Sequence, residues 1–189
     1  MSLIRPRVYR VNMQGSLSWP KPKNKIPMSH TETEMALMQR AIELALKAQA
    51  AGEVPVGALI ALDGEVIGEG WNQPILAHDP TAHAEIEALR EAGRQIQNYR
   101  LVGATLFVTL EPCVMCMGAI SHARIQRVIY GAPDPKRGAA GSALQLADAN
   151  FLNHRVEVTG GLYGEACSNL LLDFFRARRS TSSVRSSEI

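Results

Sequence analysis

Apolar residues recur at helical spacing near the start of the region that we expect to fold. Their positions are Met35, Met38, Ile42, Ala45 and Leu46. Thr31-Glu32-Thr33-Glu34 precedes them and has the form of a capping box, in which a threonine and a glutamate satisfy the free N–H groups of a helix start. The pattern predicts a helix that begins after Thr31 and stops near Gly52.

Strand-like apolar runs follow this helix. Residues 56–62 and 65–70 flank Asp63-Gly64, a dipeptide favoured in type I′ turns, so we expect an antiparallel hairpin. Residues 105–110 form a third run, and the last two are residues 127–130 and 155–159.

Helical patterns lie between and after these strands. Thr81 is expected to cap a helix over residues 82–92, and Pro112 to lie in the first turn of the next helix. Residues 164–179 have the pattern of a long last helix, with Cys167 buried in the core. The apolar side of this last helix carries Leu170, Leu171, Phe174 and Phe175. Alternation of this kind predicts an α/β fold, a mixed sheet with helices on both faces.

Composition fits one globular domain. The chain has 189 residues, 46% of them apolar, and lacks a run long enough to span a membrane or form a secretory signal. Three cysteines are too few for a disulfide scaffold. We therefore expect a cytoplasmic protein without a membrane partner.

Basic charge is concentrated at the two ends of the chain. Residues 1–31 contain six basic and no acidic residues, whereas residues 32–175 contain ten basic and seventeen acidic ones. Residues 176–189 carry four arginines against one glutamate. Such blocks either bind nucleic acid or form solvated tails. We expect residues 1–30 to be a disordered basic arm, residues 31–179 the folded domain, and residues 180–189 a disordered Ser-rich tail.

The candidate chemistry lies in two short motifs. His83-Ala84-Glu85 is followed about thirty residues later by Pro112-Cys113-Val114-Met115-Cys116. His83, Cys113 and Cys116 supply three zinc ligands, which leaves a fourth position open for a water, as in catalytic zinc sites. Glu85 is then free for proton transfer. Alone, C-x-x-C would more often mean redox chemistry or structural zinc, but its combination with H-x-E favours a catalytic site.

Longer segments around these motifs resemble the bacterial tRNA-specific adenosine deaminases, within the cytidine-deaminase-like superfamily. The resemblance covers residues 35–179 and leaves out the arm and the tail. It rests on several short stretches of the chain, which include residues 53–58, 70–72, 78–85, 98–101, 109–116, 138–142, 153–156 and 173–176.

This resemblance implies a three-layer α/β/α cytidine-deaminase-like fold with a central five-stranded sheet, a homodimer, and one Zn²⁺ per subunit. The implied reaction converts adenosine to inosine at the wobble position, 34, of a tRNA anticodon, with tRNA-Arg (anticodon ACG) as the expected partner. A zinc-activated water would attack C6 of adenine while Glu85 carries the protons. Asn72 would hydrogen-bond the purine, the Ala84 carbonyl would help hold it, and Val56 and Leu110 would wall the pocket. For Val56 an ordinary buried strand position is an equally good interpretation.

RNA contacts are expected in two other segments. Asp134, Lys136 and Arg137 follow the strand of residues 127–130, where the family's loop meets the nucleotides beside the target. An aromatic and basic group ends the last helix and consists of Phe175, Arg176, Arg178 and Arg179. Stacking and phosphate contact would suit this group, although Phe175 could equally belong to the core and the arginines could be a solvated helix end.

Two other functions remain open at this point. The same zinc site would serve a deaminase of a free base or nucleotide, such as guanine, cytosine or deoxycytidylate. A non-enzymatic RNA- or zinc-binding module is the other, but a structural zinc site does not require Glu85.

Overall fold

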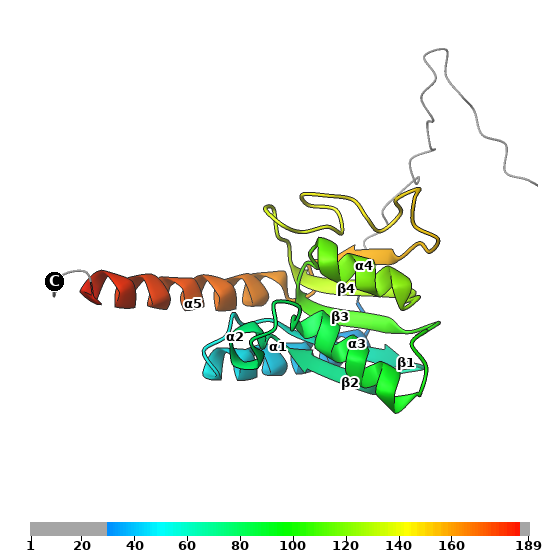
Figure 1. The fold of residues 1–189 in the computed structure, drawn as a ribbon, viewed down its shortest axis with the longest axis horizontal. Coiled ribbons are helices and arrows are strands. Elements are labelled where there is room, and N and C mark those ends of the chain that lie inside the picture. The colour runs from blue at the N-terminus through cyan, green and yellow to red at the C-terminus, as the bar shows by residue number, and fades with distance from the viewer. Residues whose placement is uncertain (1–29, 186–189) are drawn as a thin grey trace, which may run out of the picture.

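The computed structural model describes residues 30–185, with side chains up to Ser180. Residues 1–29 and 186–189, which include almost all of the expected arm, lie outside the described residues. Between these limits the chain forms one mixed five-stranded sheet with the strand order β2-β1-β3-β4-β5 (Figure 1).

The sheet has an antiparallel and a parallel half. β1 (Gly57–Leu62) pairs antiparallel with both β2 (Glu65–Trp71) and β3 (Thr105–Leu110). β4 (Arg127–Ala132) and β5 (Glu157–Gly160) continue the sheet parallel to β3. Between β1 and β2, Asp63 and Gly64 have φ angles of 52° and 85°, as a type I′ turn requires. The predicted hairpin and mixed five-stranded sheet are therefore confirmed.

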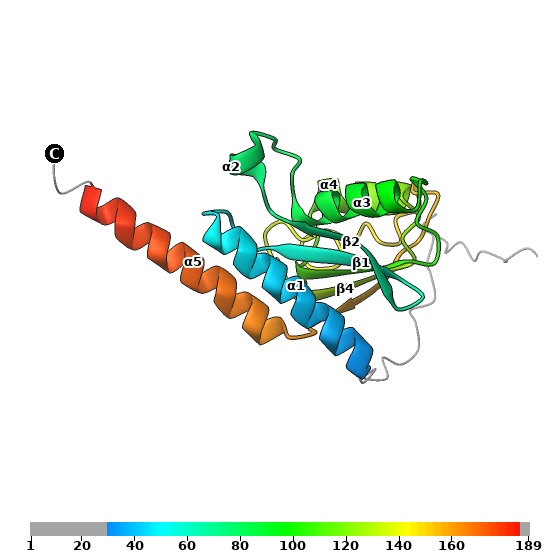
Figure 2. The same cartoon turned by 90° about the horizontal axis from the view of Figure 1, so that it is seen from below.

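Helices cover both faces of the sheet, which gives the expected three layers. α3 (Ala84–Gln95) and α4 (Val114–His122) lie on one face, and α1 (Glu32–Ala50) and α5 (Gly164–Arg185) on the other (Figure 2). Alternate side chains of each strand divide between the layers. Leu59 belongs to the core cluster beneath α1, and its neighbour Ile60 to the larger cluster beneath α3 and α4.

The first helix begins as its sequence predicts. Thr31 is the N-cap of α1, its side chain accepts a hydrogen bond from the Glu34 N–H at 3.1 Å, and the Glu34 carboxylate accepts one from the Thr31 N–H. The predicted capping box is therefore confirmed.

Two other expected helix starts are wrong by one or two residues. His83, not Thr81, is the N-cap of α3, because both the N–H and the hydroxyl of Thr81 bind the Asp79 carboxylate. Cys113 is the N-cap of α4, so Pro112 precedes the helix instead of lying in its first turn.

The structure also contains helical turns that the apolar pattern does not indicate. α2 (Pro74–Ala77) is a single turn after β2, and the pattern misses it because none of its residues is buried. α5 continues to Arg185, six residues beyond the predicted end at residue 179. Over the part of the chain that is described, no helix combines the length and the apolar character needed to cross a membrane.

Candidate active site

The three predicted metal ligands come together where two helices begin. His83 is the N-cap of α3, Cys113 is the N-cap of α4, and Cys116 lies in the first turn of α4. α3 follows the edge strand β2 through α2, and α4 follows the central strand β3 directly. The sheet therefore brings together two segments that lie thirty residues apart.

The spacing of the donor atoms matches a tetrahedral metal site. His83 Nδ1 lies 3.7 Å from Cys113 Sγ and 3.5 Å from Cys116 Sγ, and the two sulfurs are 3.7 Å apart. Ordinary Zn–S and Zn–N bond lengths in a tetrahedron place two sulfurs about 3.8 Å apart and a sulfur and a nitrogen about 3.6 Å apart. The three residues therefore fit Zn²⁺ and leave one corner of the tetrahedron for another ligand.

The two thiols differ strongly in acidity. Hydrogen bonding from Cys116, with help from His83 and the Cys116 N–H at the helix start, lowers the pKa of Cys113 to about 4. The bond to Cys113 and burial raise the pKa of Cys116. A metal ion binds both sulfurs as thiolates, so any proton that the two thiols share must leave when it binds.

Glu85 lies beside these ligands without belonging to the donor group. Its side chain is 4% exposed, and burial raises the pKa of its carboxyl above the ordinary value. The charges of His83 and Cys113 also act on it, which places it within electrostatic reach of the donors. A buried carboxyl with a raised pKa is suited both to accept and to donate a proton.

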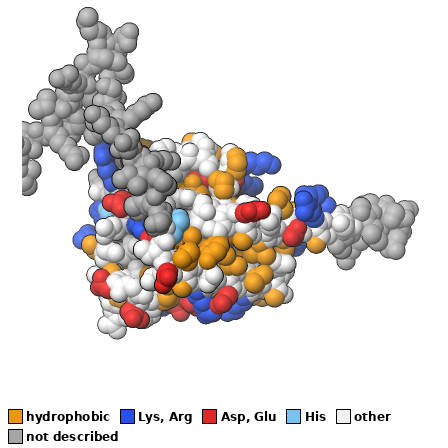
Figure 3. All heavy atoms as spheres, turned by 180° about the vertical axis from the view of Figure 1, so that it is seen from behind, with side chains coloured by type: hydrophobic (Ala, Val, Ile, Leu, Met, Phe, Trp, Pro, Cys, Tyr) orange, Lys and Arg blue, Asp and Glu red, His pale blue; other side chains and the backbone are white. Residues whose placement is uncertain are grey.

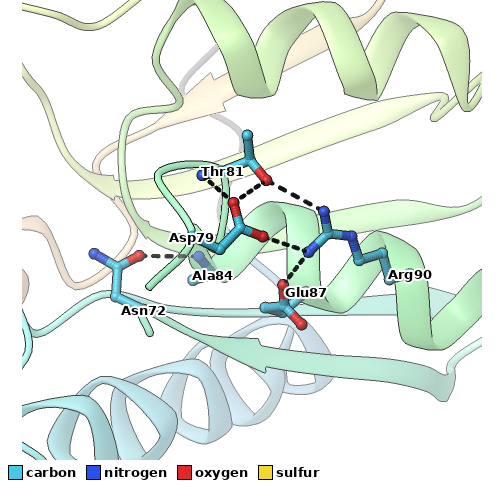
Figure 4. Close-up of polar contacts among 6 residues, drawn as sticks. All are labelled: Asn72, Asp79, Thr81, Ala84, Glu87 and Arg90. Atoms are coloured by element: carbon cyan, nitrogen blue, oxygen red, sulfur yellow. Dashed lines mark hydrogen bonds and ion pairs between the residues drawn. The ribbon is translucent and has the colours of Figure 1, made fainter. Parts of the chain in front are cut away.

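Asn72 is fixed by a backbone contact at the start of α3. Its side-chain oxygen accepts a hydrogen bond from the Ala84 N–H at 2.9 Å (Figure 4). The amide nitrogen points away from Ala84 and is the remaining donor of this buried side chain. The Ala84 carbonyl lies against β2, where a Cβ added to Gly70 would come within 2.2 Å of it. The expected contact of the Ala84 carbonyl with the adenine base stays a prediction.

A polar network fixes the loop before His83. The Asp79 carboxylate accepts hydrogen bonds from the N–H and the hydroxyl of Thr81, both at 2.7 Å. Arg90, which is exposed, lies 3.6 Å from Asp79 and 2.5 Å from Glu87 (Figure 4). Hydrogen bonds from Thr81 and the charge of Arg90 lower the pKa of Asp79. The network therefore ties the loop to the first turns of α3.

The other two residues expected to wall the adenine pocket lie at adjacent ends of two neighbouring strands. Val56 is buried immediately before β1, and Leu110, half-buried, ends β3. Since β1 and β3 are antiparallel, the start of one strand lies beside the end of the other. This arrangement agrees with the expected pocket wall and equally with the structural interpretation of Val56.

The expected RNA-binding residues form two separate groups. Lys136 and Arg137 are exposed in the loop after β4, and their N–H groups donate to Asp134 Oδ1 at 2.9 and 3.1 Å. Hydrogen bonding with Cys113 raises the pKa of His83, and the charge of Arg137 opposes this rise. The Cys113–Gly138 bridge places the loop beside the ligand segment.

The second group lies on α5. Phe174 is buried, whereas Phe175 is 43% exposed, which separates two residues that sequence alone could not distinguish. Arg176 pairs with Asp173, and Arg178 lies over the Phe174 ring. Arg179 is exposed. Figure 3 shows Lys and Arg side chains gathered toward the projecting end of α5, beyond the apolar side chains over the body of the protein.

Sequence reasoning missed two buried acids, of which Glu111 adjoins the ligand segment. Glu53 accepts a hydrogen bond from the Leu76 N–H at 2.8 Å, which holds α2. Glu111 lies in the sequence between β3 and the ligand Cys113. Its carboxylate accepts hydrogen bonds from backbone N–H groups of the loop after β4. The only signal in the sequence is an acidic residue next to apolar ones, and such a residue is usually solvated.

The fold and these donors define a class of protein, the zinc-dependent deaminases of the cytidine-deaminase-like fold. The family model of the cytidine and deoxycytidylate deaminase zinc-binding region matches residues 31–132, which include all three ligands and Glu85. The implied cofactor Zn²⁺ thus agrees with both the family and the donor geometry.

Comparison with known proteins narrows the class. The chain is 52% identical over 155 residues to the tRNA-specific adenosine deaminase of Haemophilus influenzae, covering 82% of this chain and 90% of that protein. It is 44% identical over 153 residues to the enzyme of the same name from Streptococcus pyogenes serotype M3, covering 81% of this chain and 90% of that protein. The chain belongs to the family of tRNA-specific adenosine deaminases.

Solved structures agree with this assignment. One, from work on A-to-I editing by tRNA:A34 deaminases at the wobble position of transfer RNA, superposes with a TM-score of 0.70 at 43% identity. It covers 72% of this chain and 99% of that chain. A guanine deaminase from Nitrosomonas europaea has a TM-score of 0.63 at 24% identity, covering 74% of this chain and 83% of that one, and thus shares the fold alone.

Proposed function

We propose that the protein catalyses hydrolytic deamination of adenosine to inosine at the wobble position, position 34, of a tRNA anticodon. The relatives that carry this name are similar over most of their length. By family resemblance the expected substrate is tRNA-Arg with the anticodon ACG.

The observation that carries the proposal is the place of Glu85. It is buried beside the donor group formed by His83, Cys113 and Cys116, and is not a member of that group. A structural zinc site has no need for a buried acid with a raised pKa next to it, because burial of a carboxylate destabilises the fold. A deaminase needs a group that moves protons between water and the base.

The residues divide the chemistry as follows. Zn²⁺, when held by His83, Cys113 and Cys116, supplies a Lewis acid that lowers the pKa of a water. Glu85 would take a proton from the attacking water and deliver it to N1 of adenine as the C6–O bond forms. It would then take the proton of the new C6 hydroxyl and pass it to the amino group, so that the C6–N bond breaks, ammonia leaves and the C6 carbonyl of inosine remains. Asn72 orients the purine with its amide donor.

RNA binding is assigned to the loop after β4 and to the end of α5. An anticodon base is unpaired, so extruding it into a site costs less than extruding a base from a duplex. Lys136 and Arg137 are exposed in a loop that the Cys113–Gly138 bridge joins to the ligand segment, and they can meet the phosphates flanking the target. Phe175, Arg176, Arg178 and Arg179 would extend this contact along the stem.

We also propose that the protein acts in the cytoplasm as a homodimer. All three of its cysteines, Cys113, Cys116 and Cys167, are free thiols, which suits a reducing compartment. Val114 and Met115 at the start of α4 are 50% and 36% exposed beside the ligands, and a second subunit would cover them. Light scattering of the purified protein measures this directly, and a monomer at micromolar concentration would contradict the dimer.

Comparison of substrates tests the function. The zinc-loaded protein is incubated with an anticodon stem-loop that carries adenosine at position 34, and separately with adenosine, guanine, cytosine and deoxycytidylate. We expect inosine in the stem-loop and no turnover of the free compounds, measured by mass spectrometry of the digested products. A stem-loop with its only adenosine in the paired stem is the control.

Each other outcome identifies a rival. Turnover of a free base or nucleotide alone would assign the protein to that class of deaminase. Binding of the stem-loop without any product would indicate an RNA-binding module without catalysis.

A further inference from the structure

The loop over residues 134–142 is folded around one buried carboxylate. Glu111, 2% exposed, comes directly after β3 and two residues before the ligand Cys113. Its Oε1 accepts hydrogen bonds from the Ala140 and Ser142 N–H groups, both at 3.0 Å. Its Oε2 accepts one from the Asp134 N–H at 3.0 Å and another from the Ser142 hydroxyl. One side chain therefore holds both the start of the loop, at Asp134, and its end, at Ala140 and Ser142.

The carboxylate is stabilised by backbone dipoles instead of a cation. Among the ion pairs of the described residues, none includes Glu111. Three backbone N–H groups converge on its two oxygens, and their dipoles point toward the carboxylate. A Cβ added to Gly138 would lie 2.4 Å from the Glu111 carboxyl carbon, so the loop can close around the acid only with glycine at this position.

The same loop is joined to the ligand segment. The Ala139 N–H donates to the Pro112 carbonyl at 2.8 Å, and Cys113 and Gly138 form an antiparallel bridge. The exposed tip with Lys136 and Arg137 is therefore at a fixed place relative to Cys113. Glu111 supplies the largest number of hydrogen bonds that set this place.

We propose that Glu111 is a positioning residue: it fixes the loop so that Lys136 and Arg137 meet the RNA backbone beside the reacting adenosine. This inference rests on the function proposed above. It assigns Glu111 to substrate binding, with no direct contact to the base or to the reacting atoms.

Glu111→Gln tests the proposal with little change in shape. An amide NH₂ in place of either oxygen faces at least one backbone N–H, so one hydrogen bond becomes a donor–donor contact. The variant is expected to keep one zinc per chain and a kcat within about twofold of the wild type. Its KM for the anticodon stem-loop is expected to rise about tenfold, the scale of one lost hydrogen bond to a charged group.

Two further variants control for general damage. Glu53 is also 2% exposed and accepts one N–H bond, from Leu76, which glutamine can keep through its own oxygen. Glu53→Gln should leave the KM near the wild-type value. Ser142→Ala removes only the hydroxyl at an exposed position, so it should fold if Glu111→Gln does not, and should raise the KM about threefold.

A double-mutant cycle tests whether Glu111 acts by positioning the basic tip of the loop or only by stabilising the fold. Lys136→Ala with Arg137→Ala removes the basic tip of the loop. If Glu111 acts through this tip, combining these changes with Glu111→Gln raises the KM less than the product of the separate effects. The proposal would be overturned if the KM effects of the two sets of changes multiplied fully. It would also be overturned if Glu111→Gln left the KM unchanged, whether or not zinc was lost.

The stem-loop Kd is measured for every variant as well. Absence of inosine with the wild-type protein contradicts the proposed function alone. An unchanged Kd in both Glu111→Gln and Ser142→Ala contradicts the role of Glu111 alone.

Discussion

The Asn72 side-chain oxygen accepts a hydrogen bond from the Ala84 N–H at 2.9 Å. This contact joins the residue after β2 to the first residue of α3, directly after the ligand His83. It also settles which atom of the buried amide remains available, because the oxygen is occupied and the nitrogen is left to donate.

Asn72→Asp is therefore expected to impair substrate recognition while preserving the site. Aspartate keeps an oxygen for the Ala84 N–H but replaces the amide donor with a second acceptor, which repels an acceptor atom of the purine. We expect kcat/KM for the stem-loop to fall at least about 100-fold, about 3 kcal/mol, with the zinc content unchanged.

Asn98→Asp is the matched control for this change. Asn98 also accepts a backbone N–H bond through its side chain, from Arg100 at 3.0 Å, but lies on the surface. Its replacement should leave kcat/KM within about twofold. Equal losses in the two variants would show that Asn72 does not select the base.

Glu85→Gln should abolish most turnover without releasing the metal. Glutamine fills the same volume but cannot move a proton, and general acid–base groups contribute about 10²–10⁴-fold to rates. Metal analysis should still find one zinc per chain. Glu87→Gln, two residues away and paired with Arg90 on the surface of α3, is the control and should retain activity. Loss of zinc from the Glu85 variant would mean that this residue is a ligand.

Cys113→Ala should lose zinc, because it removes one of three protein donors. Cys167→Ala is a suitable control. Cys167 is a buried thiol on α5, on the opposite face of the sheet, and burial raises its pKa to about 11. This control should keep its zinc, as measured by elemental analysis after dialysis. Full zinc occupancy in Cys113→Ala would require a different ligand set.

The part of the site that could be predicted from sequence depends on short-range spacing. His83 and Glu85 lie on the same helix start, and Cys113 and Cys116 on another, so each pair is fixed by local geometry. Strands β1 to β4 contain apolar runs long enough to be found, and β5 lies in a segment where Val156 and Val158 alternate with polar residues. These features need no knowledge of how distant segments pack.

The missed features depend on contacts between distant segments. Glu111 binds N–H groups 23 to 31 residues further along the chain, and Glu53 binds one 23 residues further along. Periodicity assigns such acids to the surface, because nothing local supplies their hydrogen-bond partners. The misplaced cap at Thr81 has a similar cause, since Asp79 competes for its N–H and hydroxyl.

Glu34 is expected to make stability depend on pH in the acid range. Although burial opposes the shift, hydrogen bonds from Thr31 and Arg127 lower its pKa below 4.5. Arg127 is the charged group that faces it, and the His30 ring lies 3.4 Å away. A lowered carboxyl pKa adds stability above the unfolded-state pKa, and this contribution is lost as the pH falls through the folded-state value.

Glu34→Gln should therefore destabilise the protein by about 1 kcal/mol at pH 7 and by much less near pH 3. Glutamine can still complete the capping box, so the difference reports the charge. Urea unfolding at the two pH values measures it. The control is Glu32→Gln in the same helical turn, which should show a smaller change with pH. A destabilisation of equal size at both pH values would contradict the assignment.

Replacing Arg176, Arg178 and Arg179 by alanine should weaken RNA binding and reduce its salt dependence. Residues 32–175 carry a net negative charge, so attraction to RNA must come from local basic groups. Each phosphate contact that is lost lowers the slope of log K against log salt by about 0.7 for a single strand. Stem-loop affinity is measured between about 50 and 200 mM salt. The charge-matched control replaces three arginines at the ends of α3 and α4 that lie away from the ligands. Arg94 lies in the last turn of α3, Arg100 follows that helix, and Arg124 follows α4. An equal change in slope for both triple variants would mean that RNA responds only to the overall charge of the protein, and that the end of α5 is not a binding surface.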